Sequence, residues 1–149
     1  MGKLSAPTNP ASICEGEVES DVVWNFTQHL ATTEQREQGV RDLPEKLRQQ
    51  LVEILTFDYL PDDEDLQIRC GEILCLIGEI DTKYGQRIMI GGAPFFMERL
   101  SAALRHSKYR PVFAFSRRES VEQVMPDGTV RKIAIFRHLG FVEPEAPQQ

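Results

Sequence analysis

The hydrophobic residues of this chain follow helical spacing over its middle part. Two stretches place apolar residues three and four positions apart, as one buried helical face requires. The first stripe is Leu47, Leu51, Ile54 and Leu55, and the second is Leu66, Cys70, Ile73, Leu74, Ile77 and Ile80. The pattern predicts one helix that starts near Asp42 and Pro44, and a longer helix from Asp62–Asp63 to the region of Tyr84–Gly85.

Helix-start and helix-stop signals predict two further helices. Thr32 and Gln35 form a capping-box pattern and Gly39 provides a stop, so a short helix is expected between residues 32 and 39. Pro94 suits the first turn of another helix, because the N–H that it lacks would have no partner there. The inward face of this last helix would consist of Phe96, Leu100, Ala103 and Leu104.

Short β-type runs alternate with these helices. They are residues 22–26, a short run around Val40, residues 87–90 and residues 111–116. Further on, residues 120–125 and 129–136 flank Pro126-Asp127-Gly128, which predicts a β-hairpin. Helices that alternate with buried strands favour a mostly parallel sheet covered on both faces, with the hairpin as an antiparallel edge. The predicted fold class is therefore a three-layer, Rossmann-like α/β domain.

Length and composition fit one folded domain. The chain has 149 residues, of which 41% are hydrophobic and 27% are charged, as in an ordinary globular protein. Residues 1–20 are small, polar and acidic with little periodic apolar content, which is typical of a flexible tail. We expect such a tail at 1–20, a single α/β domain at 21–144 and a C-terminal tail at 145–149.

Charge, hydropathy and cysteine content limit the partners, the location and the cofactors to be expected. The net charge of −6 argues against a broad nucleic-acid-binding surface, because such surfaces are basic. No apolar run could cross a bilayer and no signal-peptide core is visible, so a cytoplasmic protein without membrane contact is expected. Cys14, Cys70 and Cys75 show no metal-ligand spacing, and we expect neither a metal nor another cofactor. These features are also compatible with a homo-oligomer.

Polar residues collect where the predicted parallel strands end. Ligands of open α/β sheets bind outside the carboxyl ends of the strands, so these residues should line one crevice. They are Asn25, Thr27, Gln28 and His29 after the first strand, Gly91, Gly92 and Ala93 after the middle strand, and Ser116, Arg117, Arg118 and Glu119 after the next. Arg137 and His138 would join them if the hairpin folds back. Arginines, imidazoles and a helix start suit an anionic small molecule or nucleotide.

Each of these features also has a purely structural interpretation. Gly91-Gly92 matches no phosphate-binding motif, and such corners commonly serve tight helix–sheet packing. Arg117-Arg118 resembles a solvated pair at a strand end, of which only one side chain, by preference Arg117, can point inward. Within the glycine corner, we expect Gly91 to be required for packing and Gly92, nearer the helix start, to face a ligand.

Four segments carry a resemblance to known proteins. "NFTQH", "IGGAP", "FAFSRRESVE" and "DGTVRK...FRHLGFV" resemble a group of small bacterial and phage-type proteins of unassigned function, over roughly residues 22–143. Asn25, Phe26 and His29 are also faintly similar to the N-F-x-H start of small Rossmann-like CRISPR-associated proteins related to ring nucleases. The second resemblance implies binding, and sometimes cleavage, of cyclic oligonucleotide signals.

These observations lead to three alternative hypotheses about the function. The first is a domain that binds a nucleotide or another phosphorylated small molecule. The second is a metal-independent phosphodiesterase, with His29 and His138 as proton-transfer groups and Arg117 on the phosphate. The third is a protein-interaction module that uses the acidic tail or an exposed hairpin edge.

Overall fold

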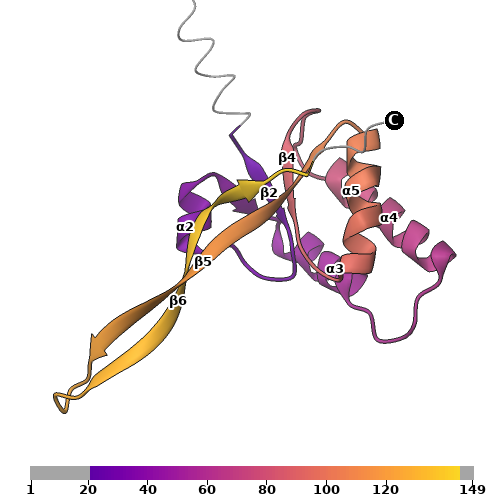
Figure 1. Cartoon of the computed structure of the whole chain (residues 1–149). Coiled ribbons are helices and arrows are strands. Elements are labelled where there is room, and N and C mark those ends of the chain that lie inside the picture. Colours follow the sequence, from indigo (N-terminus) through magenta and orange to yellow (C-terminus); the bar gives the residue numbers. More distant parts are fainter. Residues whose placement is uncertain (1–20, 145–149) are drawn as a thin grey trace, which may run out of the picture.

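A computed structural model describes residues 21–144 as five strands and four helices (Figure 1). The strands are β2 (Val23–Phe26), β3 (Val40–Asp42), β4 (Arg87–Ile90), β5 (Arg110–Val124) and β6 (Val130–Val142). The helices are α2 (Thr33–Glu37), α3 (Glu45–Leu55), α4 (Asp63–Gly78) and α5 (Pro94–His106). The predicted α/β class is confirmed, whereas the two expected tails lie outside the described residues.

The strands form one sheet in the order β3-β2-β4-β5-β6. The first four strands are parallel, and β6 is antiparallel to β5. From β2 the chain first moves to β3 at one edge and then crosses back to β4 and β5 on the other side, so the winding direction reverses between β2 and β4. Accordingly, α2 lies on one side of the sheet, and α3, α4 and α5 lie on the opposite side (Figure 1). This is the predicted Rossmann-like arrangement with an antiparallel hairpin.

The hydrophobic core is divided by the sheet. Phe26, Ile88 and Ile90 belong to the larger cluster, which includes the buried faces of α3, α4 and α5. Val23 and Met89 belong to a smaller cluster on the opposite face. Because successive strand residues point to opposite faces, Ile88, Met89 and Ile90 alternate between the two clusters. The central strands β2 and β4 are therefore buried on both faces, as parallel strands usually are.

The sequence signals place most helix starts correctly. In α2, the Gln35 N–H donates to Thr32 Oγ1 at 3.1 Å and the Thr32 N–H donates to Gln35 Oε1 at 3.0 Å, which forms the predicted capping box. In α4, the Asp65 N–H donates to the side chain of Asp62 at 2.9 Å. Pro94 occupies the first turn of α5. Local capping chemistry thus decides where these helices begin.

The end of α4 was predicted wrongly. The helix stops at Gly78 rather than near Tyr84–Gly85. The carbonyl of Ile77 accepts from the Ile80 N–H at 3.2 Å and from the Thr82 hydroxyl at 3.4 Å, so the last turn is closed by a nearby side chain. The chain then turns toward β4 instead of adding further helical residues.

The C-terminal strands are much longer than the sequence pattern indicates. Residues 111–116 and 120–125 were expected as separate strands, but β5 runs without a break through residues 116–119. Its pairing with β4 ends at Met89↔Val112, whereas its pairing with β6 continues to Val124↔Val130. The ladder with β6 holds this segment extended, and the two strands reach out from the domain as a two-stranded arm (Figure 1). We call residues 115–139 the arm.

Candidate functional site

A cavity of about 390 Å³ lies at the carboxyl ends of β2 and β4. It is lined by Thr27, Gln28, His29, Leu30, Thr32, Gln35, Met89, Ile90, Gly91, Gly92, Phe113 and Ala114. These residues come from the segment after β2, the first turn of α2, the end of β4 and the adjoining part of β5. The winding direction reverses between β2 and β4, and this switch point is where doubly wound sheets bind ligands. We call this space the switch-point cavity.

Asn25 organises one wall of the cavity without lining it. Its buried amide donates to the His29 carbonyl at 2.8 Å and to Asp42 Oδ1 at 2.7 Å. Its oxygen accepts from the Thr27 N–H at 3.0 Å and from the Thr27 hydroxyl at 2.7 Å. These bonds fix the turn that carries Thr27, Gln28 and His29. Asn25, predicted to bind ligand, is therefore placed to position the residues that do line the cavity.

Asp42 anchors the same turn from β3. Besides Asn25, it accepts from the Ala31 N–H at 3.0 Å and from the Arg36 guanidinium at 2.9 Å. Burial by itself would raise the pKa of Asp42, but the hydrogen bonds from Asn25, Arg36 and Ala31 and the charge of Arg36 outweigh it. The pKa therefore falls below its ordinary value of 3.8.

Asp42→Asn should destabilise the fold in a pH-dependent way. A lowered folded-state pKa means that the carboxylate stabilises the protein fully above the ordinary value of 3.8 and that this stability is lost as the pH falls through the lower folded-state pKa. We expect the variant to lose about 2 kcal/mol at neutral pH, from its charged hydrogen bonds. In thermal melts at descending pH, the difference in melting temperature between the variant and the parent should shrink as the solution becomes acidic. Asp58→Asn, at an exposed position, is the control, and a gap that stays constant would contradict this role of Asp42.

The glycine corner differs from the expectation in one respect. Gly92 has a φ of 153°, which side-chain-bearing residues rarely adopt, whereas Gly91 has no such conformation. A Cβ on Gly91 would meet only Thr27 Cγ2 at 3.4 Å, an ordinary contact. The packing role expected for Gly91 is therefore wrong: the backbone requires glycine at position 92, and Gly91 tolerates a methyl group. Both glycines line the switch-point cavity, and the ligand-facing role of Gly92 stays a prediction.

Alanine substitutions should separate these two glycines. Gly92→Ala should lower the free energy of unfolding by about 1 kcal/mol, because alanine is strained at that φ. Gly91→Ala should change it by less than about 0.5 kcal/mol, because its methyl group makes only an ordinary contact. Denaturant unfolding of both variants checks the order, and a larger loss for Gly91→Ala would contradict it.

The arm residues that were expected in the crevice do not line the switch-point cavity. Because β5 continues as a strand, Ser116, Arg117, Arg118 and Glu119 lie along the arm. Their charges meet one another there: Arg117 lies 2.9 Å and Arg137 3.3 Å from Glu119. Arg137 also lies 3.6 Å from Glu34 of α2. Ala93 is the N-cap of α5 and is also absent from the lining.

The structure places the two predicted catalytic imidazoles in different surroundings. His29 lines the switch-point cavity and is exposed. His138 is buried where β6 meets α2, with Nε2 3.2 Å from Gln38 Oε1 and its ring 4.9 Å from that of Phe141. Burial lowers the pKa of His138, and the nearby Glu34 carboxylate offsets only part of this effect. His138 thus anchors the base of the arm and does not line the cavity.

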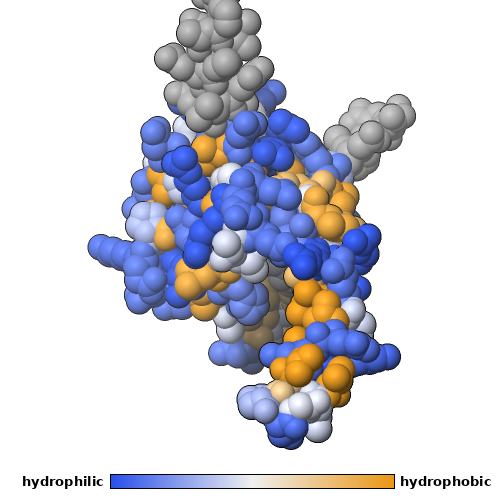
Figure 2. All heavy atoms as spheres, turned by 90° about the vertical axis from the view of Figure 1, so that its left-hand side faces the viewer, coloured by the Kyte–Doolittle hydropathy of each residue, from blue (hydrophilic) through white to orange (hydrophobic). Residues whose placement is uncertain are grey.

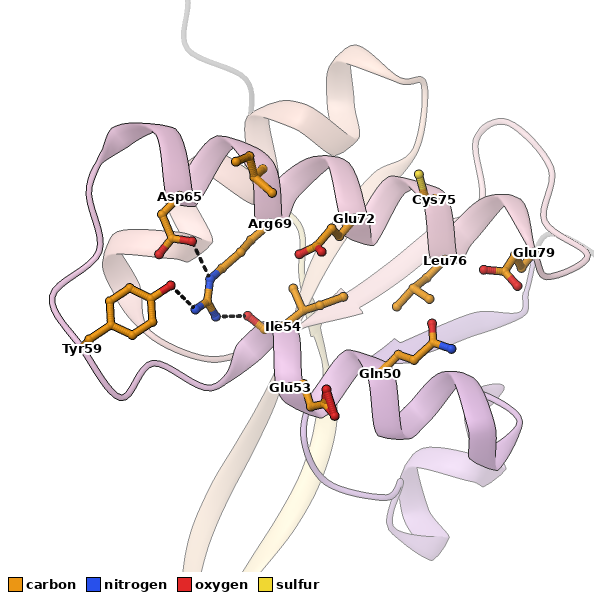
Figure 3. A pocket seen from close by; sticks show the side chains of 11 residues that line it. Gln50, Glu53, Ile54, Tyr59, Asp65, Arg69, Glu72, Cys75, Leu76 and Glu79 are labelled. Atoms are coloured by element: carbon orange, nitrogen blue, oxygen red, sulfur yellow. Dashed lines mark hydrogen bonds and ion pairs between the residues drawn. The ribbon is translucent and has the colours of Figure 1, made fainter.

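A second concave surface lies between α3 and α4, with a volume of about 540 Å³ (Figure 3). Arg69 is central to it and was not singled out from the sequence. Its guanidinium donates to the carbonyls of Ile54 at 2.7 Å and Thr56 at 2.8 Å, and to the hydroxyl of Tyr59 at 3.2 Å. It also lies 4.2 Å from the ring centroid of Phe57. The sequence signal for it is an arginine placed within the apolar stripe of α4, beside Leu66, Cys70 and Ile73.

The groove between α3 and α4 is acidic. Glu53, Asp65, Glu72 and Glu79 line it together with Ile54, Ile68 and Leu76. Arg69 is the only basic residue of the lining, and it is occupied by α3 carbonyls, Tyr59 and Asp65. The chemistry of this groove therefore differs from that of the switch-point cavity, whose lining contains no aspartate, glutamate, lysine or arginine.

The fold and the cavity define a doubly wound α/β domain with an open switch point. The chain belongs to the uncharacterized protein MJ1673 family, whose family model matches residues 21–142. This confirms membership in a family of unassigned function, and the match includes both the cavity and the arm. No curated protein and no solved structure matches the chain. Between residues 21 and 144, no helix is long and apolar enough to cross a membrane.

Proposed function

We propose that this domain binds a nucleotide or another phosphorylated small molecule in the switch-point cavity. The observation that carries the proposal is the position of the cavity, at the carboxyl ends of β2 and β4 where the winding reverses. Its volume of about 390 Å³ lies within the range of small-molecule sites. We also propose that this binding takes place in the cytoplasm, where such ligands are available.

The lining suits a ligand with one flat apolar part and one polar part. Leu30 and Phe113 offer apolar surface for a base, and Thr27 and Gln28 offer hydrogen-bonding groups. The backbone at Gly91-Gly92, without side chains, allows a phosphate to approach closely. The lining contains no lysine or arginine, so recognition of a phosphate would depend on hydrogen bonds from backbone and polar side-chain donors rather than on ion pairs with lysine or arginine.

Cyclic nucleotides belong to the ligand class proposed here. The resemblance of Asn25, Phe26 and His29 to CRISPR-associated proteins supports including cyclic oligonucleotides, and a role in phage defence is a hypothesis tied to that ligand. A phosphodiesterase activity is not proposed, because His29 lines the cavity without His138. No other titratable side chain lines the cavity to serve as a second proton-transfer group.

Calorimetry with mono-, di- and cyclic nucleotides, supported by thermal-shift assays, tests this proposal. At least one member of the panel should bind and raise the melting temperature. His29→Ala should weaken that binding about tenfold, the effect of losing one hydrogen bond to a charged group. His106→Ala is the matched control, because His106 is an exposed imidazole at the end of α5 and lies outside the lining. A flat response across the panel would refute the proposal.

A further inference from the structure

The arm carries apolar side chains into solvent. Phe136 is 69% exposed and Val124 is 72% exposed, and Phe115, Val130 and Leu139 are also exposed. Figure 2 shows hydrophobic surface beside hydrophilic surface on the projecting arm. An isolated two-stranded ribbon is only marginally stable in water, and stable sheets have more strands or a packed face. The exposed apolar side chains and the two-stranded form of the arm thus favour the addition of strands from another molecule.

The β4-facing edge of β5 is open along the arm. β4 pairs with β5 only from Arg87↔Arg110 to Met89↔Val112. Beyond Val112, the only strand that pairs with β5 within the described residues is β6, on its other side. A long, exposed strand edge with apolar residues is a template for pairing with another strand.

We propose that this edge pairs with the same edge of a second copy of the chain, antiparallel, about a two-fold axis at Ser120. The result would be a four-stranded sheet in the order β6-β5-β5-β6, with two strands from each copy. Closed two-fold dimers are the commonest oligomers of soluble proteins, and their interfaces must be complementary to themselves. The charge pattern of β5 meets that requirement at one register.

The register follows from side-chain alternation. Directly opposed residues of two antiparallel strands point to the same face of the sheet, and successive residues of one strand alternate between the faces. A two-fold axis perpendicular to the sheet meets both conditions only if it passes between one residue and the same residue of the other copy. An axis at Ser120 sets Arg118 of each copy opposite Glu122 of the other. An axis at Arg117, Arg118, Glu119 or Glu122 would set that charged residue opposite its own copy, and an axis at Val121 would oppose no charged pair. An axis at Arg118 would also set Arg117 opposite Glu119, but Glu119 is already held by Arg117 and Arg137 of its own chain. Ser120 is therefore the favoured axis.

The two charged side chains that would meet in the dimer have no ion-pair partner within the described residues of the monomer. Glu119 is already held by Arg117 and Arg137. Between residues 21 and 144, neither Arg118 nor Glu122 forms an ion pair. The same two residues are the ones that the axis at Ser120 sets opposite each other.

The opposite edge of the arm is less suitable for self-pairing. Between residues 130 and 139, β6 carries Arg131, Lys132 and Arg137 and no acidic residue. Pairing β6 with its own copy would gather these cations on adjacent strands, which opposes association. By contrast, residues 116–124 of β5 carry two basic and two acidic residues, so two β5 strands can approach without net repulsion.

Charge exchange at the two opposed positions tests the dimer. Sedimentation or light scattering should give twice the 17.0 kDa chain mass for the parent protein. Arg118→Glu and Glu122→Arg should each raise the dissociation constant of the dimer about tenfold or more. In either variant, both of the symmetric pairs between positions 118 and 122 then carry two charges of the same sign. Mixing the two variants should restore a dimer, since every opposed pair is again of opposite sign. The double exchange R118E/E122R should restore it within one chain.

Two controls make the test specific. Arg131→Glu changes the net charge by the same amount as Arg118→Glu but lies on β6, and it should stay dimeric. Glu122→Arg also sets an arginine opposite Lys132 inside the arm, and the double variant carries the same local change. Recovery in the double variant therefore reports the contact between copies. A monomeric parent, single variants that stay dimeric, or a mixture that does not recover would each overturn the proposal.

Discussion

Replacing Arg69 with methionine should destabilise the protein by about 3 kcal/mol or more, because buried acceptors lose their donors. The guanidinium bonds the carbonyls of Ile54 and Thr56 at the end of α3, and it contacts the ring of Phe57. Methionine restores much of the volume but offers no N–H. The side chain thus acts as an internal cap that ties the α3–α4 connection to α4.

Chemical denaturation monitored by circular dichroism checks this result. Arg48→Met is the matched control, because Arg48 makes a single i,i+3 ion pair with the exposed Glu45 on α3. Such a pair contributes little, so the control should change the free energy of unfolding by less than about 0.5 kcal/mol. Equal losses in both variants would show that the bonds of Arg69 contribute no more than a surface charge does.

Gly39→Ala should be the most damaging glycine substitution, with a loss of about 2 kcal/mol or more, because it combines a steric clash with backbone strain. Gly39 ends the α2 turn with a φ of 99°, and a Cβ there would lie 2.3 Å from the carbonyl oxygen of Asp21. That oxygen belongs to the backbone, so relief requires the chain before β2 to move. The turn from α2 into β3 depends on glycine at this position.

Gly71→Ala provides a control of opposite sign. Gly71 lies within α4, and a Cβ there would meet nothing within 4 Å. Alanine has the higher helix propensity, so this variant should gain about 0.5–1 kcal/mol. Thermal melts of the two variants should shift in opposite directions. A Gly39→Ala protein that melts together with the parent would contradict the steric account.

The sequence predicts elements whose causes are local. The capping box of Thr32 and Gln35, the stripes of α3 and α4, and Pro94 at the start of α5 all act over a few residues, and the structure has each of them. At the end of α4, the N–H groups of Glu79 and Ile80 and the hydroxyl of Thr82 bond the last carbonyls, and no helical periodicity reports such contacts. The continuity of β5 depends on a pairing partner in β6 and is equally invisible in a local pattern.

The candidate site was predictable where it follows from topology. Strand ends after β2 and β4 meet at the switch point, so Thr27, Gln28 and His29 line one cavity with the glycine corner. The arginines could not be placed in this way, because residues 116–119 continue a strand instead of ending one. Arg69 was missed because a charged residue in an apolar helical stripe is hard to interpret until its α3 partners are known.

The most direct test of ligand binding at the switch point is an amide NMR titration of the full chain with the nucleotide panel. We expect the largest chemical-shift changes at Thr27, Gln28, His29, Gly91 and Gly92, because their backbones border the cavity. Such a pattern would locate the ligand at the carboxyl ends of β2 and β4. Changes concentrated in the α3–α4 groove or along the arm, with none at the glycine corner, would contradict the account.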